Sequence, residues 1–248
     1  GRVNDLLLFA IPDAQARQIR ELRLRGEVAA EARIFRDAER DRIAFEVEGR
    51  LEEGAAQPFD GDVAIEAIRG DVRVTNDGFD LAPIQARLGE GEVEVRGAWR
   101  LASARPPATQ TPEETDGPNR GEPDRGALAD IDATLRGRGV RVHEGLADLL
   151  PPDTPSRAAI LRRIGELQPE GLVDFQAKLA RPVRQGKPGP LDFDVTVEPR
   201  RLAFTLDERR LAFRDMTGSM RYEDRGIELD RLRGTSEEGT FAATGLID

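Results

Sequence analysis

The feature that most constrains the fold of this chain is an internal repeat. Residues 68–100 align with residues 216–248 without a gap, at a constant offset of 148 positions. The aligned glycines are Gly70 and Gly218, Gly78 and Gly226, Gly91 and Gly239, and Gly97 and Gly245. Between them the apolar positions stay apolar but exchange Val, Ile, Leu, Phe, Met and Ala. A backbone built twice needs its glycines at the same places, so we predict tandem copies of one unit.

Shorter blocks extend the repeat over most of the chain. Residues 2–12 align with 141–151, residues 19–28 with 164–173, and residues 43–47 with 191–195. The offset grows from block to block, so the length differences fall where loops are expected. We predict two copies, 1–101 and 127–248. Residues 102–126 are rich in Pro, Thr, Glu and Gly with almost no apolar side chain, and are predicted to be a disordered Pro-rich linker or loop.

Apolar residues alternate with charged or small ones along most of each copy. A period of two is typical of strands with one apolar and one solvated face. The turn signal at residues 76–78 separates two such strands as a hairpin. The phase of the alternation changes near Ala67, and again between Phe213 and Met216. This predicts a β-bulge at the same place in both copies.

One stretch of each copy has helical spacing, residues 13–22 and residues 155–168, which predicts one short helix packed on the sheet in each copy. About six strands per copy need their apolar face covered, and one short helix cannot cover them. Aromatic residues make up only 5% of the chain, which favours an open apolar surface over a filled two-layer core. The predicted fold is therefore mainly β: tandem antiparallel β-sheet repeats that form a curved, twisted, half-open groove.

The apolar positions share one parity within each run, so their side chains leave the sheet on one side. The expected groove lining in the first copy is Val28, Ala30, Ile34, Phe45, Val47, Val72, Val74, Val93 and Val95. In the second copy it is Val173, Phe175, Leu179, Phe193, Val195, Met220, Tyr222, Phe241 and Ala243. A long exposed apolar strip usually marks a binding surface. Its natural ligand is an apolar chain, so we expect lipid acyl chains.

The residue types that carry catalysis or metal binding do not form a recognisable site. His143 is the only histidine and aligns with Asn4, and there is no cysteine, so no metal centre or catalytic base is expected. The acidic turn around Asp77 has Arg225 in the second copy, where calcium would need an oxygen ligand. The serines lack a base partner. A net charge of −10 without a basic patch argues against nucleic acid. We expect no enzyme and no cofactor.

The layout G-x-V-x-V, G-F-x-L and G-x-V-x-V-x-G, with a helical insert before the stretch LQPEGLVDF, resembles the AsmA-like repeat family. That group includes TamB-type envelope proteins, which form a long, twisted, half-open β-groove and are regarded as bridge-like lipid carriers. The resemblance implies an internal segment of a periplasmic cell-envelope protein that conducts lipid between membranes in membrane biogenesis. It also implies membrane contact through parts outside this segment, and outer-membrane proteins as further partners.

Two other functions fit the same residues. The first is a structural or assembly scaffold for envelope β-proteins, in which sheet edges guide other strands without lipid transport. The second is an extracellular β-rich surface module without a lipid ligand. The apolar face distinguishes a lipid carrier from a scaffold. A lipid carrier needs this face open and continuous, whereas a scaffold could have it filled.

The linker interpretation makes a prediction about stability. Residues 102–126 have no counterpart in the repeat and almost nothing to anchor them to a sheet. Deleting residues 106–124 and joining the ends with a short Gly-Ser turn should therefore leave the thermal unfolding midpoint nearly unchanged. A deletion that lowers the free energy of unfolding by several kcal/mol would show that the stretch packs on the sheet.

Overall fold

The structure is a computed structural model. It describes residues 23–37, 42–57, 63–101, 128–143, 145–146, 157–184, 187–189, 192–206, 208–223 and 226–247. The helix expected over residues 13–22 and the linker expected over residues 102–126 lie outside these ranges. The second expected helix is present as α3, Arg157–Leu167, within the predicted stretch 155–168.

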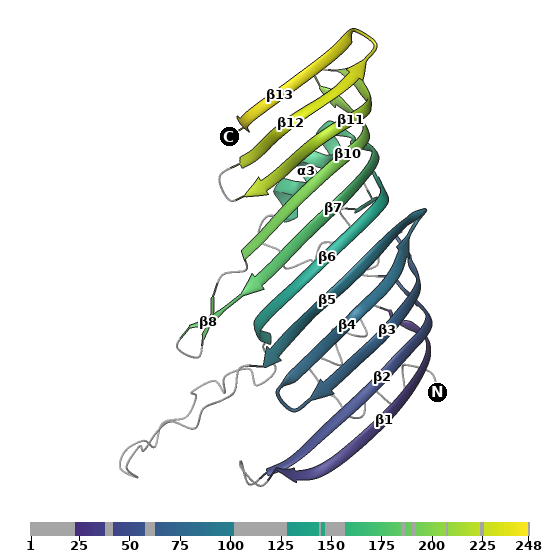
Figure 1. The fold of residues 1–248 in the computed structure, drawn as a ribbon, viewed down its shortest axis with the longest axis vertical. Coiled ribbons are helices and arrows are strands. Elements are labelled where there is room, and N and C mark those ends of the chain that lie inside the picture. Colours follow the sequence, from purple (N-terminus) through teal and green to yellow (C-terminus); the bar gives the residue numbers. More distant parts are fainter. Residues whose placement is uncertain are drawn as a thin grey trace.

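Eleven strands form one antiparallel sheet whose strand order follows the chain (Figure 1). The strands are β1 (Arg25–Asp37), β2 (Arg42–Ala56), β3 (Ile65–Thr75), β4 (Gly78–Leu88), β5 (Gly91–Leu101), β6 (Leu128–Val142), β7 (Glu170–Arg181), β10 (Asp192–Leu206), β11 (Arg209–Glu223), β12 (Gly226–Ser236) and β13 (Gly239–Ile247). Two short strands, β8 (Val183–Arg184) and β9 (Lys187–Pro188), make a separate hairpin. Strands hold 83% of the described residues and the sheet is not closed, which confirms the predicted fold class.

The two sequence copies merge into this single sheet. Strands β1–β5 correspond to β7 and β10–β13, and β6 lies between the two sets, paired with β5 on one side and β7 on the other. The backbone irregularities repeat with the sequence. The β4–β5 register shifts between Leu81 and Ile84, and the β12–β13 register shifts between Leu229 and Leu232, 148 residues later. The repeat is therefore one of backbone geometry as well as of sequence.

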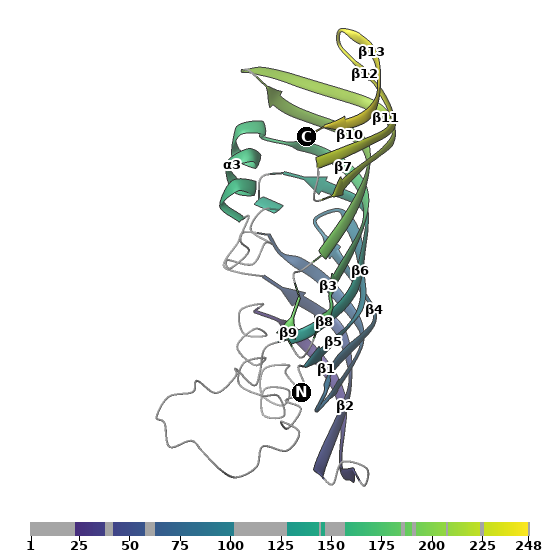
Figure 2. The ribbon, with the colours of Figure 1, turned by 90° about the vertical axis from the view of Figure 1, so that its left-hand side faces the viewer.

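The predicted bulges are confirmed in both copies. Ala67 in β3 has a φ of 50° and Asp215 in β11 has a φ of 51°, and the strand registers shift beside each residue. Positive φ also occurs at Glu53 in β2, Gly139 in β6 and Arg231 in β12. These residues lie at a similar level of the sheet, and an inserted residue bends a strand and increases its twist. The strands accordingly curve toward the side on which α3 lies (Figure 2).

Two small clusters of buried apolar residues lie near the level of the bulges. The first contains Leu51, Ala56 and Ile68. The second contains Val63, Leu88, Val140 and Val173, with Leu146 packed against it. Of these seven residues Val140 is the most completely buried, at 1% exposure. The core therefore follows the bend in the sheet.

The bulge at Ala67 gives a test of the backbone geometry. The side chain of Ala67 is exposed, so a substitution there acts through the backbone. Ala67→Val places a β-branched residue at positive φ, which should lower the free energy of unfolding by about 1–3 kcal/mol in urea titrations. Ala67→Gly tolerates this φ and should stay within about 1 kcal/mol of the parent. Equal stability of the two variants would contradict a left-handed residue at this position.

Candidate functional site: the apolar face

One face of the sheet is predominantly apolar, with Arg36 and Arg181 among the exceptions that the strand registers place on it. Directly paired residues of an antiparallel sheet project to the same side, so the strand registers define each face. One line of paired residues from β1 to β10 is Ala30, Gly49, Val72, Leu81, Gly97, Ala133, Leu179 and Phe193. A second line from β4 to β13 is Ile84, Val95, Leu135, Ala177, Val195, Tyr222, Ile227 and Ile247. We call this side the apolar face.

All eighteen residues expected to line a groove occupy the apolar face by register. The side chains of Phe193 and Tyr222 lie outside the described part of the structure, so these two residues are assigned to the apolar face from backbone pairing alone. The pairings add residues that the sequence analysis did not name as lining. These are Leu51, Phe79, Leu81, Ile84, Trp99, Ala133, Leu135, Ala177, Val197, Leu229 and Leu232. Those on β6 could not be found from the repeat, because that strand has no counterpart in the aligned copies.

Much of the apolar face remains partly accessible. Val72, Val74, Val95 and Val195 are half-buried, and Ile34 near the end of β1 is 77% exposed. Within the part of the chain that the structure describes, the only other sheet is the two-stranded β8–β9 hairpin, which contacts β6 and is too small to cover this side. Helix α3 lies there, close to β10 (Figure 2). Fully buried side chains are few and gather near the bend. The apolar face therefore differs from the core of a β-sandwich, where two sheets bury each other.

Several aromatic rings on this face pack along the sheet itself. A Cβ on Gly137 would lie 2.1 Å from Cε1 of Phe175, and one on Gly234 would lie 2.6 Å from Cε1 of Phe241. Each ring therefore covers a cross-strand glycine, a known way of protecting glycines in a sheet. Phe241 also meets Phe213 edge-on, with ring centroids 4.8 Å apart. Phe175 and Phe241 were predicted as lining residues, and their described contacts give them a packing role.

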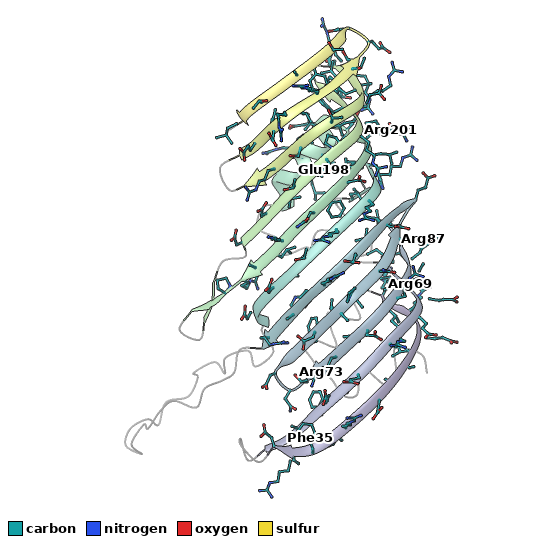
Figure 3. The ribbon with its side chains drawn as sticks, viewed as in Figure 1. Phe35, Arg69, Arg73, Arg87, Glu198 and Arg201 are labelled. Atoms are coloured by element: carbon teal, nitrogen blue, oxygen red, sulfur yellow. The ribbon has the colours of Figure 1, made fainter. Side chains whose placement is uncertain are left out.

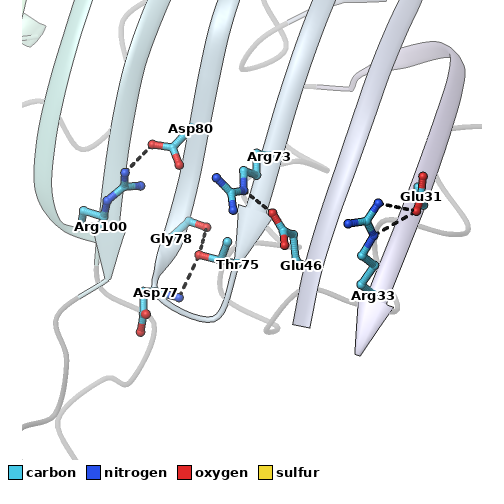
Figure 4. A network of polar contacts seen from close by, with 9 residues as sticks. All are labelled: Glu31, Arg33, Glu46, Arg73, Thr75, Asp77, Gly78, Asp80 and Arg100. Atoms are coloured by element: carbon cyan, nitrogen blue, oxygen red, sulfur yellow. Dashed lines mark hydrogen bonds and ion pairs between the residues drawn. The ribbon is translucent and has the colours of Figure 1, made fainter. Parts of the chain in front are cut away.

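The opposite face carries arginines paired with acidic residues on neighbouring strands (Figures 3 and 4). Arg50 of β2 forms an ion pair with Asp71 of β3 at 2.7 Å, and Arg73 of β3 forms one with Glu46 of β2. A further pair joins Arg100 of β5 to Asp80 of β4. Exposed pairs of this kind contribute little stability each, about 0–1 kcal/mol. Their combined effect is a face that stays hydrated, so the sheet is amphipathic as a whole.

Shallow depressions on the charged face do not suggest a separate site. One lies over β6, β7 and β10, where it is lined by Arg136, Lys178, Asp194 and Glu198 among others. Within it Asp194 already accepts two hydrogen bonds from Arg221, at 3.0 and 2.7 Å. The lining mixes cations and anions that satisfy one another, so the depression favours no particular ligand charge.

Asp174 of β7 joins three strands at the boundary between the copies. Its Oδ1 accepts a 2.7 Å hydrogen bond from the backbone N–H of Gly139 in the β6 bulge. Its Oδ2 accepts two more from Arg200 of β10, at 3.0 and 2.6 Å. Burial alone would raise the pKa of Asp174, but the hydrogen bonds from Gly139 and Arg200 outweigh it and hold this pKa below its usual value. We call this arrangement the Asp174 clamp.

The Asp174 clamp predicts a pH dependence of stability. A carboxyl whose folded pKa lies below its unfolded value of about 3.9 stabilises the fold fully above that value, and this contribution is lost as the pH falls through the folded pKa. At pH 7, Asp174→Asn should lower the free energy of unfolding by about 1.5–3 kcal/mol, the usual value of hydrogen bonds to a charged group. The gap between parent and variant should narrow below about pH 4.

Urea titrations between pH 7 and pH 3 would measure that gap directly. Glu90→Gln, in the turn between β4 and β5, serves as the control variant and should follow the parent throughout. A gap that stays constant down to pH 3 would contradict the role given to the ionised Asp174.

His143 and the β3–β4 turn, both considered as catalytic or metal sites, make hydrogen bonds to the backbone. His143 is exposed, and its Nδ1 accepts a 3.2 Å hydrogen bond from the N–H of Gly145. In the β3–β4 turn, Oδ1 of Asn76 accepts a 2.7 Å hydrogen bond from the N–H of Phe45. The Thr75 hydroxyl accepts a hydrogen bond from the N–H of Asp77 and donates one to Gly78 O (Figure 4). Among the described residues no cluster of acidic or histidine side chains is arranged to hold a metal ion.

No helix within the described ranges has the length and apolarity needed to span a bilayer. Comparison of the chain with protein-family models, with curated proteins and with solved structures finds no match.

Proposed function

We propose that the apolar face binds lipid acyl chains, and that the protein is a non-enzymatic carrier of lipid between membranes of the cell envelope. The observation that carries the proposal is the combination of continuity and accessibility. Apolar residues continue from strand to strand across the sheet, yet residues such as Val72, Val95 and Val195 remain half-buried, and none of the described strands forms a second layer over them. A large accessible apolar surface is uncommon in a monomeric protein unless it binds something.

The dimensions of the apolar face suit acyl chains. Neighbouring strands lie ~4.8 Å apart, so eleven strands span roughly 50 Å across the sheet. The hydrocarbon core of a bilayer is about 30 Å thick, which gives about 15 Å for the chains of one leaflet. The apolar face is therefore longer than one acyl chain, and a bound chain has apolar neighbours at every strand along its path.

The chemistry of the lining supports the same ligand. The accessible positions are mainly Val, Ile, Leu and Ala, which have no polar groups to orient a ligand. Such a surface favours a ligand without polar groups of its own, and it permits movement because no single contact fixes a position. The charged face keeps the other side of the sheet in water. In this proposal the membranes are reached through parts outside this segment, and outer-membrane proteins are further partners in the envelope.

The proposal can be tested with two neighbouring residues that face opposite sides. Val195 lies on the apolar face and Thr196 on the charged face of β10, and both are half-buried. A photoreactive amino acid at position 195 should form covalent adducts with phospholipid acyl chains when the full chain is incubated with phosphatidylethanolamine–phosphatidylglycerol vesicles and irradiated. The same group at position 196 should give few adducts. Mass spectrometry identifies the adduct and its site.

A matched pair of charge substitutions measures the consequence for binding. Val195→Asp places a carboxylate in the path of an acyl chain, where its desolvation costs several kcal/mol, and should abolish lipid capture. Thr196→Asp adds the same charge to the solvated face and should leave capture unchanged. Circular dichroism checks that both variants are folded. A folded parent with no adduct at position 195 would refute lipid binding and favour the scaffold function, in which this face is filled by protein.

A further inference from the structure

The two copies differ in what lies beside their last strand. β5 closes the first copy and β13 closes the second, and the two are equivalent by the 148-residue offset. β5 is paired on both sides, with β4 and β6. β13 is paired with β12, and within the described residues no strand pairs with its outer edge. The same edge therefore occurs twice in the sheet: β6 pairs with it at β5, and no described strand pairs with it at β13.

The glycines of this edge follow the occupied copy. A Cβ on Gly91 would lie 2.7 Å from Cα of Val140, and one on Gly97 would lie 2.8 Å from Cβ of Ala133. Val140 and Ala133 both belong to β6, so these two positions are glycine because β6 comes close. The equivalent Gly239 and Gly245 of β13 have no atom within 4 Å of such a Cβ. The glycines that allow β6 to approach β5 are thus repeated on β13, beside which no strand of the described residues lies.

Backbone conformation and exposure show the same contrast. Gly239 and Gly245 have φ values of 135° and 141°, whereas Gly91 and Gly97 lie outside this region. Leu246 is 59% exposed, while its equivalent Ala98 beside β6 is half-buried. The β13 edge therefore has a backbone that departs from the geometry of its occupied equivalent and an apolar side chain open to water, both of which a neighbouring strand would change.

We propose that the outer edge of β13 is a docking site for an antiparallel strand with the residue pattern of β6. The register follows from the occupied edge. In the occupied edge Val95 pairs with Leu135 and Gly97 with Ala133. Ala243 is equivalent to Val95, so it would pair with the residue of the added strand that corresponds to Leu135. The added strand would present small apolar residues to the apolar face and charged residues to the other. Addition of a strand to a free edge is a common mode of peptide recognition.

The strand directions favour an added β6-type strand over direct contact with β1 of a second copy. β5 and β7 are both antiparallel to β6, so they run parallel to each other. β13 is equivalent to β5 and β1 to β7. Suppose that β1 of a second copy lay against β13, with the apolar faces of the two copies on the same side. β1 and β13 would then pair in parallel, whereas every pairing in this sheet is antiparallel. One intervening strand of opposite direction restores the antiparallel order.

Disulfide trapping tests the site and its register, because the chain has no cysteine of its own. The full chain carrying Ala243→Cys is mixed in a glutathione buffer with a synthetic peptide of residues 128–142 that carries Leu135→Cys. We expect a cross-linked product, detected by non-reducing gel and mass spectrometry. A peptide with Thr134→Cys presents its thiol to the opposite face, where the distance between Cβ atoms exceeds disulfide reach, and should give at least about tenfold less product.

The occupied edge supplies the matched control. Val95→Cys sits at the equivalent position of β5, whose edge is already paired with β6, and should give no product with either peptide. Equal yields at positions 95 and 243 would show adsorption to the apolar face and overturn edge docking. Equal yields with the two peptides, or with a peptide of scrambled sequence, would overturn the register. A disulfide between two copies at position 243 as the sole product, despite excess peptide, would show that β13 pairs with itself.

Discussion

The structure depends on one constraint of β-strands, which is that side chains alternate between two faces. Each residue inserted at a bulge reverses that alternation. In β3 the apolar residues fall at odd positions before Ala67 and at even positions after it, and in β11 the same reversal surrounds Asp215. Sequence phase and backbone change together, so the apolar face passes through the bend without interruption. Had the sequence kept its phase, half of each strand would present charged residues to the concave side.

The same constraint explains which parts of the fold are predictable from sequence. The bulges at Ala67 and Asp215 are readable because large apolar residues lie on both sides of each. The irregularity in β2 is not, since Glu52, Glu53 and Gly54 give no apolar signal between Leu51 and Ala56. Period-two patterning predicts strands and their faces well. It does not predict that one sheet runs through both copies, because that follows from how β6 joins them.

Some features of the candidate site can likewise be predicted from sequence, and others cannot. Sequence parity assigns the apolar face, since alternation alone decides which side a residue takes. It cannot assign the packing of Phe175 over Gly137, which joins residues of different strands. The Asp174 clamp is equally hidden, because Gly139 and Arg200 lie 35 and 26 positions away and no local pattern links them. Such contacts become visible only when the strand registers are known.

The order of strands in the sheet matches their order in the chain, apart from the small β8–β9 hairpin. Each strand of the described sheet therefore pairs with the strand that precedes it in the sheet order, and no pairing joins strands from opposite ends of the chain. Folds with local pairings of this kind form faster than those that must close long loops. A chain of this topology can assemble strand by strand in the direction of synthesis, and each completed strand becomes the template for the next.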